Sequence, residues 1–177
     1  MTTARDGPAL VWRGAAASAG RIPGAVVIVL DPAGEASHGE LPATWRPLTE
    51  TLRIGWVRLP ADGAGVAAAD AVLADLPGRN AHLVTSGLGT ELALRLAAGR
   101  ASGVGSVFLV DPEPFDGSLT GADSVERSAW WKDAGLGAEL AEKGVLVRVF
   151  HSDGLGIAAP APLGLPQVVD WVRGAVG

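Results

Sequence analysis

The chain has 177 residues, of which 48% are hydrophobic and 19% are charged, with 25 glycines and 12 prolines; this composition is typical of one globular domain rather than of a disordered or fibrous protein. The formal net charge is −5, and the 14 Lys and Arg residues are scattered singly along the chain, so we expect no nucleic-acid partner. Cysteine is absent, which excludes disulfides, thiol catalysis and the common zinc frameworks.

Short β-branched runs alternate with longer segments rich in Ala and Leu, the pattern of strands that are buried between two layers of helices. Six strands are predicted, over residues 9–12, 25–30, 53–59, 82–86, 106–110 and 145–150, with the first at an edge of the sheet. Helices are predicted over residues 45–52, 66–76, 88–98, 128–143 and 166–176. The sequence therefore predicts a single α/β domain over residues 1–177, with a mostly parallel sheet of about six strands flanked by helices.

The N-terminal stretch and the three histidines bear on targeting and on metal binding. The N-terminal stretch MTTARDGPALVWRGAAASAG lacks the charged and apolar regions of a secretory signal, and the longest apolar runs are far shorter than the ~20 residues that cross a bilayer. We therefore expect a soluble, cytoplasmic protein without a membrane partner. The histidines, His38, His82 and His151, are too far apart in sequence to form a ligand pair at helical spacing. We predict no metal and no cofactor.

Three irregular segments follow predicted strands directly, at residues 31–43, 111–127 and 152–165. In a parallel sheet such segments gather at the carboxyl edge, where ligands usually bind. We therefore expect any functional site to draw on these three segments and on the glycine-rich turn at Gly87.

That turn lies in HLVTSGLGTELALRLAA, residues 82–98, where a strand, a glycine-rich corner and a helix follow one another. As a dinucleotide-binding fingerprint the segment is incomplete, because Leu92 stands where a Gly or Ala is needed. The expected acidic residue would be Asp111, in a poor context, and no G-K-[ST] run marks a P-loop. A nucleotide-binding α/β domain stays open as an alternative.

The order of several motifs resembles the α/β-hydrolase superfamily. VVIVLDPAG (26–34) resembles its third strand and oxyanion loop, residues 44–65 resemble the segment that follows, and residues 81–98 are similar to the family's nucleophile turn and helix. VFLVDPEPF (107–115), VLVRVFHSDG (145–154) and LPQVVDWVRGAV (165–176) resemble the sixth strand, the seventh strand and the closing helix. The resemblance implies a three-layer sandwich of the esterase and thioesterase type, without a cap domain because only a short polar loop follows the sixth strand.

The resemblance also places the catalytic residues, and it places the nucleophile at Gly87. Active relatives carry a serine there, on a strained turn with positive φ that glycine adopts without steric cost. The catalytic histidine would lie in the loop before the last helix, where LGIAAPAPLGL (155–165) has none. The acid would be Asp111, which can equally be an ordinary turn residue; at the family's other acid position only Asp153 is near.

The oxyanion loop departs from the family pattern too, because Asp31 and Pro32 replace His-Gly. Backbone N–H groups of Ala33 and Leu88 remain as donors for an anion or a carbonyl oxygen, although Asp31 would oppose a negative charge. The resemblance thus gives the following candidate ligand-binding residues: Asp31, Ala33, Gly34, Gly87 and Leu88.

Two readings of function follow from these residues. The first is a non-catalytic protein of this fold that binds a small ligand or a protein partner. The alternative is an esterase or thioesterase with a displaced set of Ser86, His151 and Asp111, in which His151 ends the seventh strand at the correct edge. Strand alternation aims Ser86 away from the side that the family's serine uses, and a base must lie within about 3 Å of its nucleophile.

Overall fold

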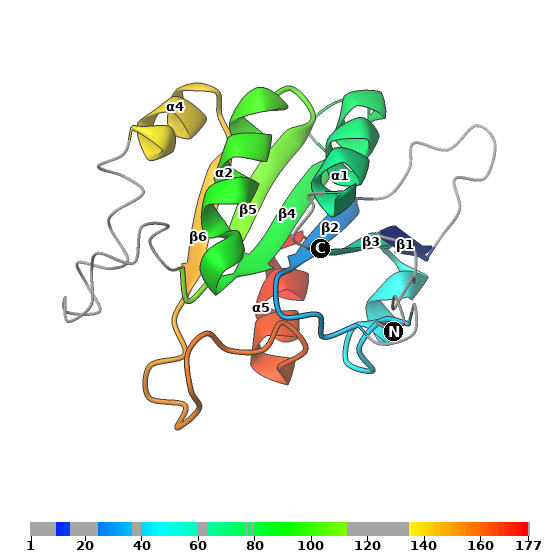
Figure 1. The fold of residues 1–177 in the computed structure, drawn as a ribbon, viewed down its shortest axis with the longest axis vertical. Coiled ribbons are helices and arrows are strands. Elements are labelled where there is room, and N and C mark those ends of the chain that lie inside the picture. Colours follow the sequence, from blue (N-terminus) through cyan, green and yellow to red (C-terminus); the bar gives the residue numbers. More distant parts are fainter. Residues whose placement is uncertain are drawn as a thin grey trace, which may run out of the picture.

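The computed structural model describes residues 10–14, 25–36, 40–59, 64–76, 78, 80–112 and 135–176. Within them, six strands form one sheet in the order β1-β3-β2-β4-β5-β6 (Figure 1). The strands are β1 (Leu10–Arg13), β2 (Val26–Asp31), β3 (Arg53–Arg58), β4 (Ala81–Ser86), β5 (Val104–Val110) and β6 (Leu146–Phe150). The α-helices are α1 (Ala64–Asp75), α2 (Thr90–Gly99), α4 (Leu136–Glu142) and α5 (Pro166–Val176), and two short 3-10 helices are η1 (Arg46–Glu50) and η2 (Gly87–Gly89).

The sheet is parallel except for β1, which pairs antiparallel with β3 at one edge. The register aligns Leu30 with Thr85, Ser86 with Val110, and Val110 with Phe150. The segments that follow β2, β4, β5 and β6 therefore leave the sheet at the same carboxyl edge, as the sequence predicts.

The predicted α/β class and mostly parallel six-stranded sheet are confirmed, and each strand lies within two residues of its expected bounds. The last helix, residues 166–176, has the expected limits. The prediction of a helix over residues 45–52 is corrected to the five-residue 3-10 helix η1, and the helix expected from residue 88 starts as η2 before α2 begins at Thr90. Of the helix expected over residues 128–143, residues 136–142 form α4, and residues 128–134 lie outside the described ranges.

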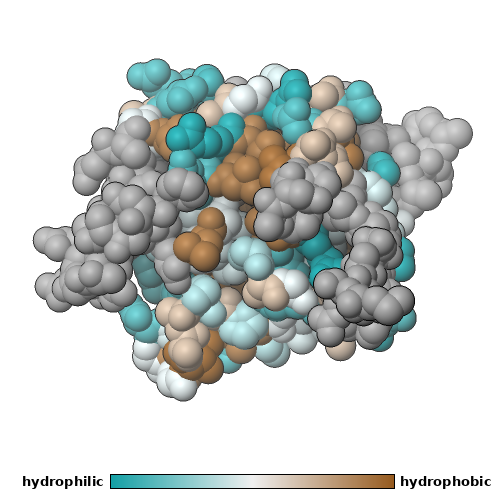
Figure 2. All heavy atoms as spheres, in the orientation of Figure 1, coloured by the Kyte–Doolittle hydropathy of each residue, from teal (hydrophilic) through white to brown (hydrophobic). Residues whose placement is uncertain are grey.

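The sheet is buried on both faces, which explains why β2 has six buried residues in a row. One core lies under α1, α2 and α4 and contains Leu73, Leu94 and Leu140; the other lies under α5 and η1 and contains Trp45 and Val168. Figure 1 shows these helices over opposite faces, and in Figure 2 some hydrophobic surface remains visible between α1 and α2. None of the helices in the described part of the chain is long and apolar enough to cross a bilayer.

Gly65 lies where α1 closely approaches the end of β3. A Cβ atom there would overlap the backbone carbonyl oxygen of Arg58 and crowd a methyl group of Val57, whereas a Cβ at Gly174 in α5 meets nothing within 4 Å. We expect Gly65→Ala to lower the free energy of unfolding by about 2 kcal/mol, because backbone cannot yield as a flexible side chain does. Gly174→Ala should raise it by about 0.5–1 kcal/mol through helix propensity. Urea denaturation of both variants checks this, and a loss smaller than 0.5 kcal/mol at Gly65 would contradict the close approach.

Candidate functional site

The carboxyl edge of the sheet brings the sequence-predicted site residues onto four neighbouring strands. Asp31 ends β2, Ser86 ends β4 and Gly87 follows it, Asp111 follows β5, and His151 follows β6. The candidate nucleophile corner at Gly87 therefore lies between Asp31 on one side and Asp111 and His151 on the other.

The corner at Gly87 is a sharp turn from β4 into η2 and α2. Gly87 is buried and has a φ of 45°, in the left-handed region that costs most non-glycine residues free energy. The Thr90 hydroxyl donates to the Gly87 carbonyl (2.7 Å), and the Thr85 hydroxyl donates to the Leu30 carbonyl (2.9 Å), which ties the corner to β2. The corner thus has a positive φ at a residue that carries no side chain. The next residue, Leu88, is 68% exposed.

Ser86 and His151 do not form a pair. Ser86 is 2% exposed, and alternation along β4 places it on the same face as Val84, in the core under α5. Its hydroxyl makes no hydrogen bond with any residue that the structure describes, whereas His151 and Asp153 are exposed to solvent. A general base needs hydrogen-bond reach to its nucleophile, and no such bond joins these two side chains within the described ranges.

Asp111 anchors the loop between β6 and α5, residues 151–165, which we call the β6–α5 loop. One carboxylate oxygen accepts the backbone N–H of Ser152 (2.8 Å) and the other accepts that of Ala161 (2.7 Å), and both bonds are buried. Asp111 also has a positive φ of 43°, which Asp tolerates better than most residues. These two bonds hold two points of the β6–α5 loop against the end of β5.

Asp31 holds the segment after β2 in the same manner. It is 1% exposed, and its oxygens accept the backbone N–H groups of Gly34 (2.7 Å) and Ala36 (3.2 Å) and the indole N–H of Trp56 (2.8 Å). The side chain is therefore turned into its own loop. Ala33 and Gly34 are exposed at the surface of that loop.

Glu35 is a residue that sequence reasoning missed. Its two carboxylate oxygens accept the backbone N–H groups of Leu163 (2.6 Å) and Gly164 (2.8 Å). Burial raises the pKa of Glu35, the two backbone hydrogen bonds oppose this rise, and the nearby Asp31 carboxylate adds to it. The partners lie 128 and 129 residues away in the chain, so no local pattern could have revealed the contact.

Two further side chains hold the same part of the β6–α5 loop. The hydroxyl of Thr44 donates to the Gly164 carbonyl (2.7 Å), and the indole N–H of Trp45 donates to the Leu163 carbonyl (2.8 Å). The loop in which the family resemblance expects a catalytic histidine is thus fastened to β5 by Asp111 and to the segment after β2 by these residues and Glu35.

The ionisation of Glu35 gives a pH-dependent prediction with a definite sign. Because its pKa is raised in the folded protein, the folded state binds the proton more tightly than the unfolded chain does. The contribution of this proton to stability is present below the unfolded pKa of about 4.5 and is lost as pH rises through the folded pKa.

We therefore expect the free energy of unfolding of the wild type, relative to Glu35→Gln, to fall as pH rises from 4.5 towards 7. Glutamine keeps only one acceptor oxygen, which adds a constant offset but no slope. Urea titrations of both proteins at fixed ionic strength measure the difference. A difference that grows with pH would show that the two hydrogen bonds outweigh burial.

His82 lies at the opposite, amino edge of the sheet, where the sequence places it. Its Nδ1 is 2.7 Å from the Ser106 hydroxyl, and burial, together with the charge of Arg148, lowers its pKa. Within the described ranges, no group of three or more His, Cys, Asp and Glu side chains is arranged to hold a metal ion.

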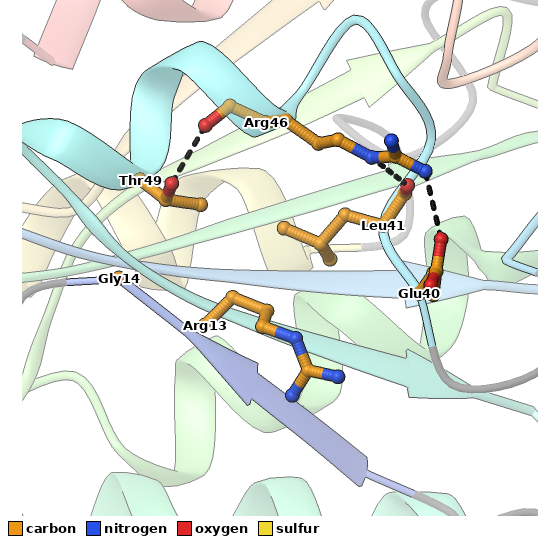
Figure 3. A pocket seen from close by; sticks show the side chains of 6 residues that line it. All are labelled: Arg13, Gly14, Glu40, Leu41, Arg46 and Thr49. Carbon is orange, nitrogen blue, oxygen red and sulfur yellow. Dashed lines mark hydrogen bonds and ion pairs between the residues drawn. The ribbon is translucent and has the colours of Figure 1, made fainter.

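A cavity of about 390 Å³ lies away from the Gly87 corner, lined by Arg13, Gly14, Glu40, Leu41, Arg46 and Thr49 (Figure 3). Arg13 pairs with Ile54 near the start of β3, which puts the cavity towards the amino edge of the parallel strands. The cavity is therefore separate from the carboxyl-edge residues.

Comparison with solved structures gives the fold a wider context. No protein-family model matches the chain, and no curated protein matches it. Its structure is similar to that of Est816, an N-acyl homoserine lactone degrading enzyme, with 12% identity, 93% of this chain and 95% of that chain covered, and a TM-score of 0.50.

It is also similar to the thioesterase domain from the curacin biosynthetic pathway, with 17% identity over 73% of this chain and a TM-score of 0.40, and the chain spans about half (49%) of that domain. A third similar structure is a hydrolase from Oleispira antarctica, at 12% identity, 94% and 62% coverage of the two chains and a TM-score of 0.42. The chain has an α/β-hydrolase-like fold, which confirms the architecture that the sequence resemblance implies.

Proposed function

We propose that this α/β-hydrolase-like protein is non-catalytic and acts by binding a small ligand or a protein partner at the carboxyl edge of its sheet. The observation that carries the proposal is the buried Gly87, with a φ of 45°, at the corner where an esterase presents its nucleophile. A residue without a side chain offers no atom for covalent attack.

The carboxylates of the edge support the same proposal. Asp31 and Asp111 both accept N–H groups with both oxygens, and within the described ranges no histidine donates to either carboxylate as in a catalytic triad. Large apolar side chains are exposed in the segments after the strands, where Leu88, Leu155 and Ile157 are 68%, 43% and 38% exposed.

The first test is an activity assay with p-nitrophenyl acetate and short acyl thioesters. We expect no turnover above a heat-denatured sample of the same protein. We expect Gly87→Ser to be equally inactive and about 1 kcal/mol less stable, because serine is strained at this φ and no histidine faces the corner within the described ranges. Robust esterase activity in Gly87→Ser would show that a base does reach the turn.

The substitution Ser86→Ala distinguishes the non-catalytic proposal from the alternative, a hydrolase with Ser86 as nucleophile. The Ser86 hydroxyl is buried without a partner among the described residues, so its removal should leave the free energy of unfolding unchanged or slightly raised. Saturable turnover in the wild type that disappears in Ser86→Ala would overturn the non-catalytic proposal.

The ligand class is open to a thermal-shift screen with carboxylates, acyl compounds and nucleotides. A ligand that binds only the folded state raises the melting temperature with its concentration. A nucleotide that does so, with a response altered by Gly87→Ser, would favour the nucleotide-binding alternative over the hydrolase-derived one.

A further inference from the structure

We propose that the cavity between β1 and η1 is a binding site for a small anion, a carboxylate or a phosphate ester, held between the guanidinium groups of Arg13 and Arg46. The cavity of about 390 Å³ lies in the size range of small-molecule sites. It is distinct from the carboxyl edge, so the proposal does not depend on the function proposed above.

Arg46 is held in place for this role. Its Nε donates to the Leu41 carbonyl (3.3 Å) and its Nη2 pairs with the Glu40 carboxylate (2.8 Å). A guanidinium carries five N–H donors in a planar fork, so these two bonds leave further donors of Arg46 for a ligand. Planar forks of this kind match carboxylate and phosphate oxygens.

The second arginine comes from another element. Arg13 is the last residue of β1. Its guanidinium lines the same cavity as the guanidinium of Arg46 and the carboxylate of Glu40 (Figure 3). The Thr49 hydroxyl, which donates to the Arg46 carbonyl (2.6 Å), adds a polar oxygen to the wall. Two side chains from β1 and η1 thus bring their charges to one hollow.

The charge of the wall selects the ligand. The described lining residues include two guanidinium groups and one carboxylate, on a chain whose formal net charge is −5. The two guanidinium groups attract a ligand with one or two negative charges to this hollow. Of the described lining residues, Arg13, Glu40, Arg46 and Thr49 have polar or charged side chains, which favours a hydrophilic ligand over an acyl chain.

The test is NMR titration of the ¹⁵N-labelled full chain with sodium succinate and, separately, with potassium phosphate. We expect saturable shifts of the backbone amides of Gly14, Leu41 and Thr49, with half-saturation of at least one probe below about 5 mM at low salt, and weaker binding at 0.5 M NaCl because salt screens the attraction. Which probe saturates first distinguishes a carboxylate site from a phosphate site. Absence of saturation by 20 mM of both probes would overturn the proposal.

Two variants of one ion pair give the sharper result. Arg46→Gln removes a donor of the site and should weaken binding at least tenfold. Glu40→Gln removes the negative charge of the wall and should tighten binding about threefold, by the loss of a repulsion of about 0.7 kcal/mol. If the pair only maintained the shape of the loop, both substitutions would weaken binding, and that outcome would overturn the assignment.

Arg95→Gln serves as the matched control. Arg95 pairs with Glu91 on the surface of α2, and its replacement changes the net charge of the protein by the same amount as Arg46→Gln. We expect succinate or phosphate to bind this variant within twofold of the wild type. A tenfold loss in Arg95→Gln would show that the anion responds to overall charge and would overturn a site at Arg46.

Discussion

Asp111→Ala is expected to lower the free energy of unfolding by about 3–5 kcal/mol. The substitution leaves the backbone N–H groups of Ser152 and Ala161 buried without their acceptors, and each such loss costs about 1–3 kcal/mol. Alanine also tolerates the φ of 43° less well than aspartate does. Asp111→Asn keeps one acceptor and suits the backbone conformation, so we expect about half the loss.

Urea denaturation measures both variants, and Asp153→Ala is the matched control because Asp153 is an exposed aspartate of the same β6–α5 loop. We expect the control to stay within about 0.5 kcal/mol of the wild type. Hydrogen exchange should report faster exchange of the Ser152 and Ala161 amides in Asp111→Ala. A loss below 1 kcal/mol would mean that the carboxylate does not anchor the loop.

Asp31→Ala is expected to have a similar cost, about 3–5 kcal/mol. Its carboxylate accepts three N–H groups, and the bonds from Ala36 and from the indole of Trp56 are both buried. Loss of the acceptor leaves these donors desolvated and unpaired. Asp75→Ala, an exposed aspartate at the end of α1, is the control and should change stability little.

A double-mutant cycle isolates the indole contact of Asp31. Trp56→Phe removes the N–H donor, so Asp31→Ala should cost about 1–2 kcal/mol less in that background than in the wild type. Denaturation of the two single variants and the double variant supplies the coupling energy. A coupling of zero would show that the bond from Trp56 contributes nothing to stability.

Sequence periodicity was sufficient for the strands and for much of the helical layer. A run of six apolar residues such as Ala25 to Leu30 can be buried on both faces only in a sheet with helices on each side, and the structure has this arrangement. The resemblance located the Gly87 corner, because a strand, a tight glycine turn and a helix are local features of the chain. Helix limits were less accurate near Pro47 and Gly87, where 3-10 geometry replaces α-helical turns.

The use of the carboxylates lay beyond sequence reasoning. The sequence predicts that the charge of Asp31 opposes an anion at the oxyanion loop, whereas the structure shows its oxygens accepting N–H groups of its own loop and of Trp56. Glu35 gave no sign of its role, because its partners are backbone groups, which have no residue-specific signature. The cavity lined by Arg13 and Arg46 has no sequence signature for a different reason, because its two arginines are far apart in the chain and are brought together by β1 and η1.

The bonds from Glu35 to Leu163 and Gly164 also set an order of events during synthesis. The carboxylate of Glu35 can accept these two N–H groups only after more than 120 further residues have been synthesised. Contacts of such long range form slowly. A nascent chain that has emerged only as far as β6 leaves the carboxylates of Glu35 and Asp111 without these partners. The segment after β2 therefore gains these contacts only once the β6–α5 loop has left the ribosome.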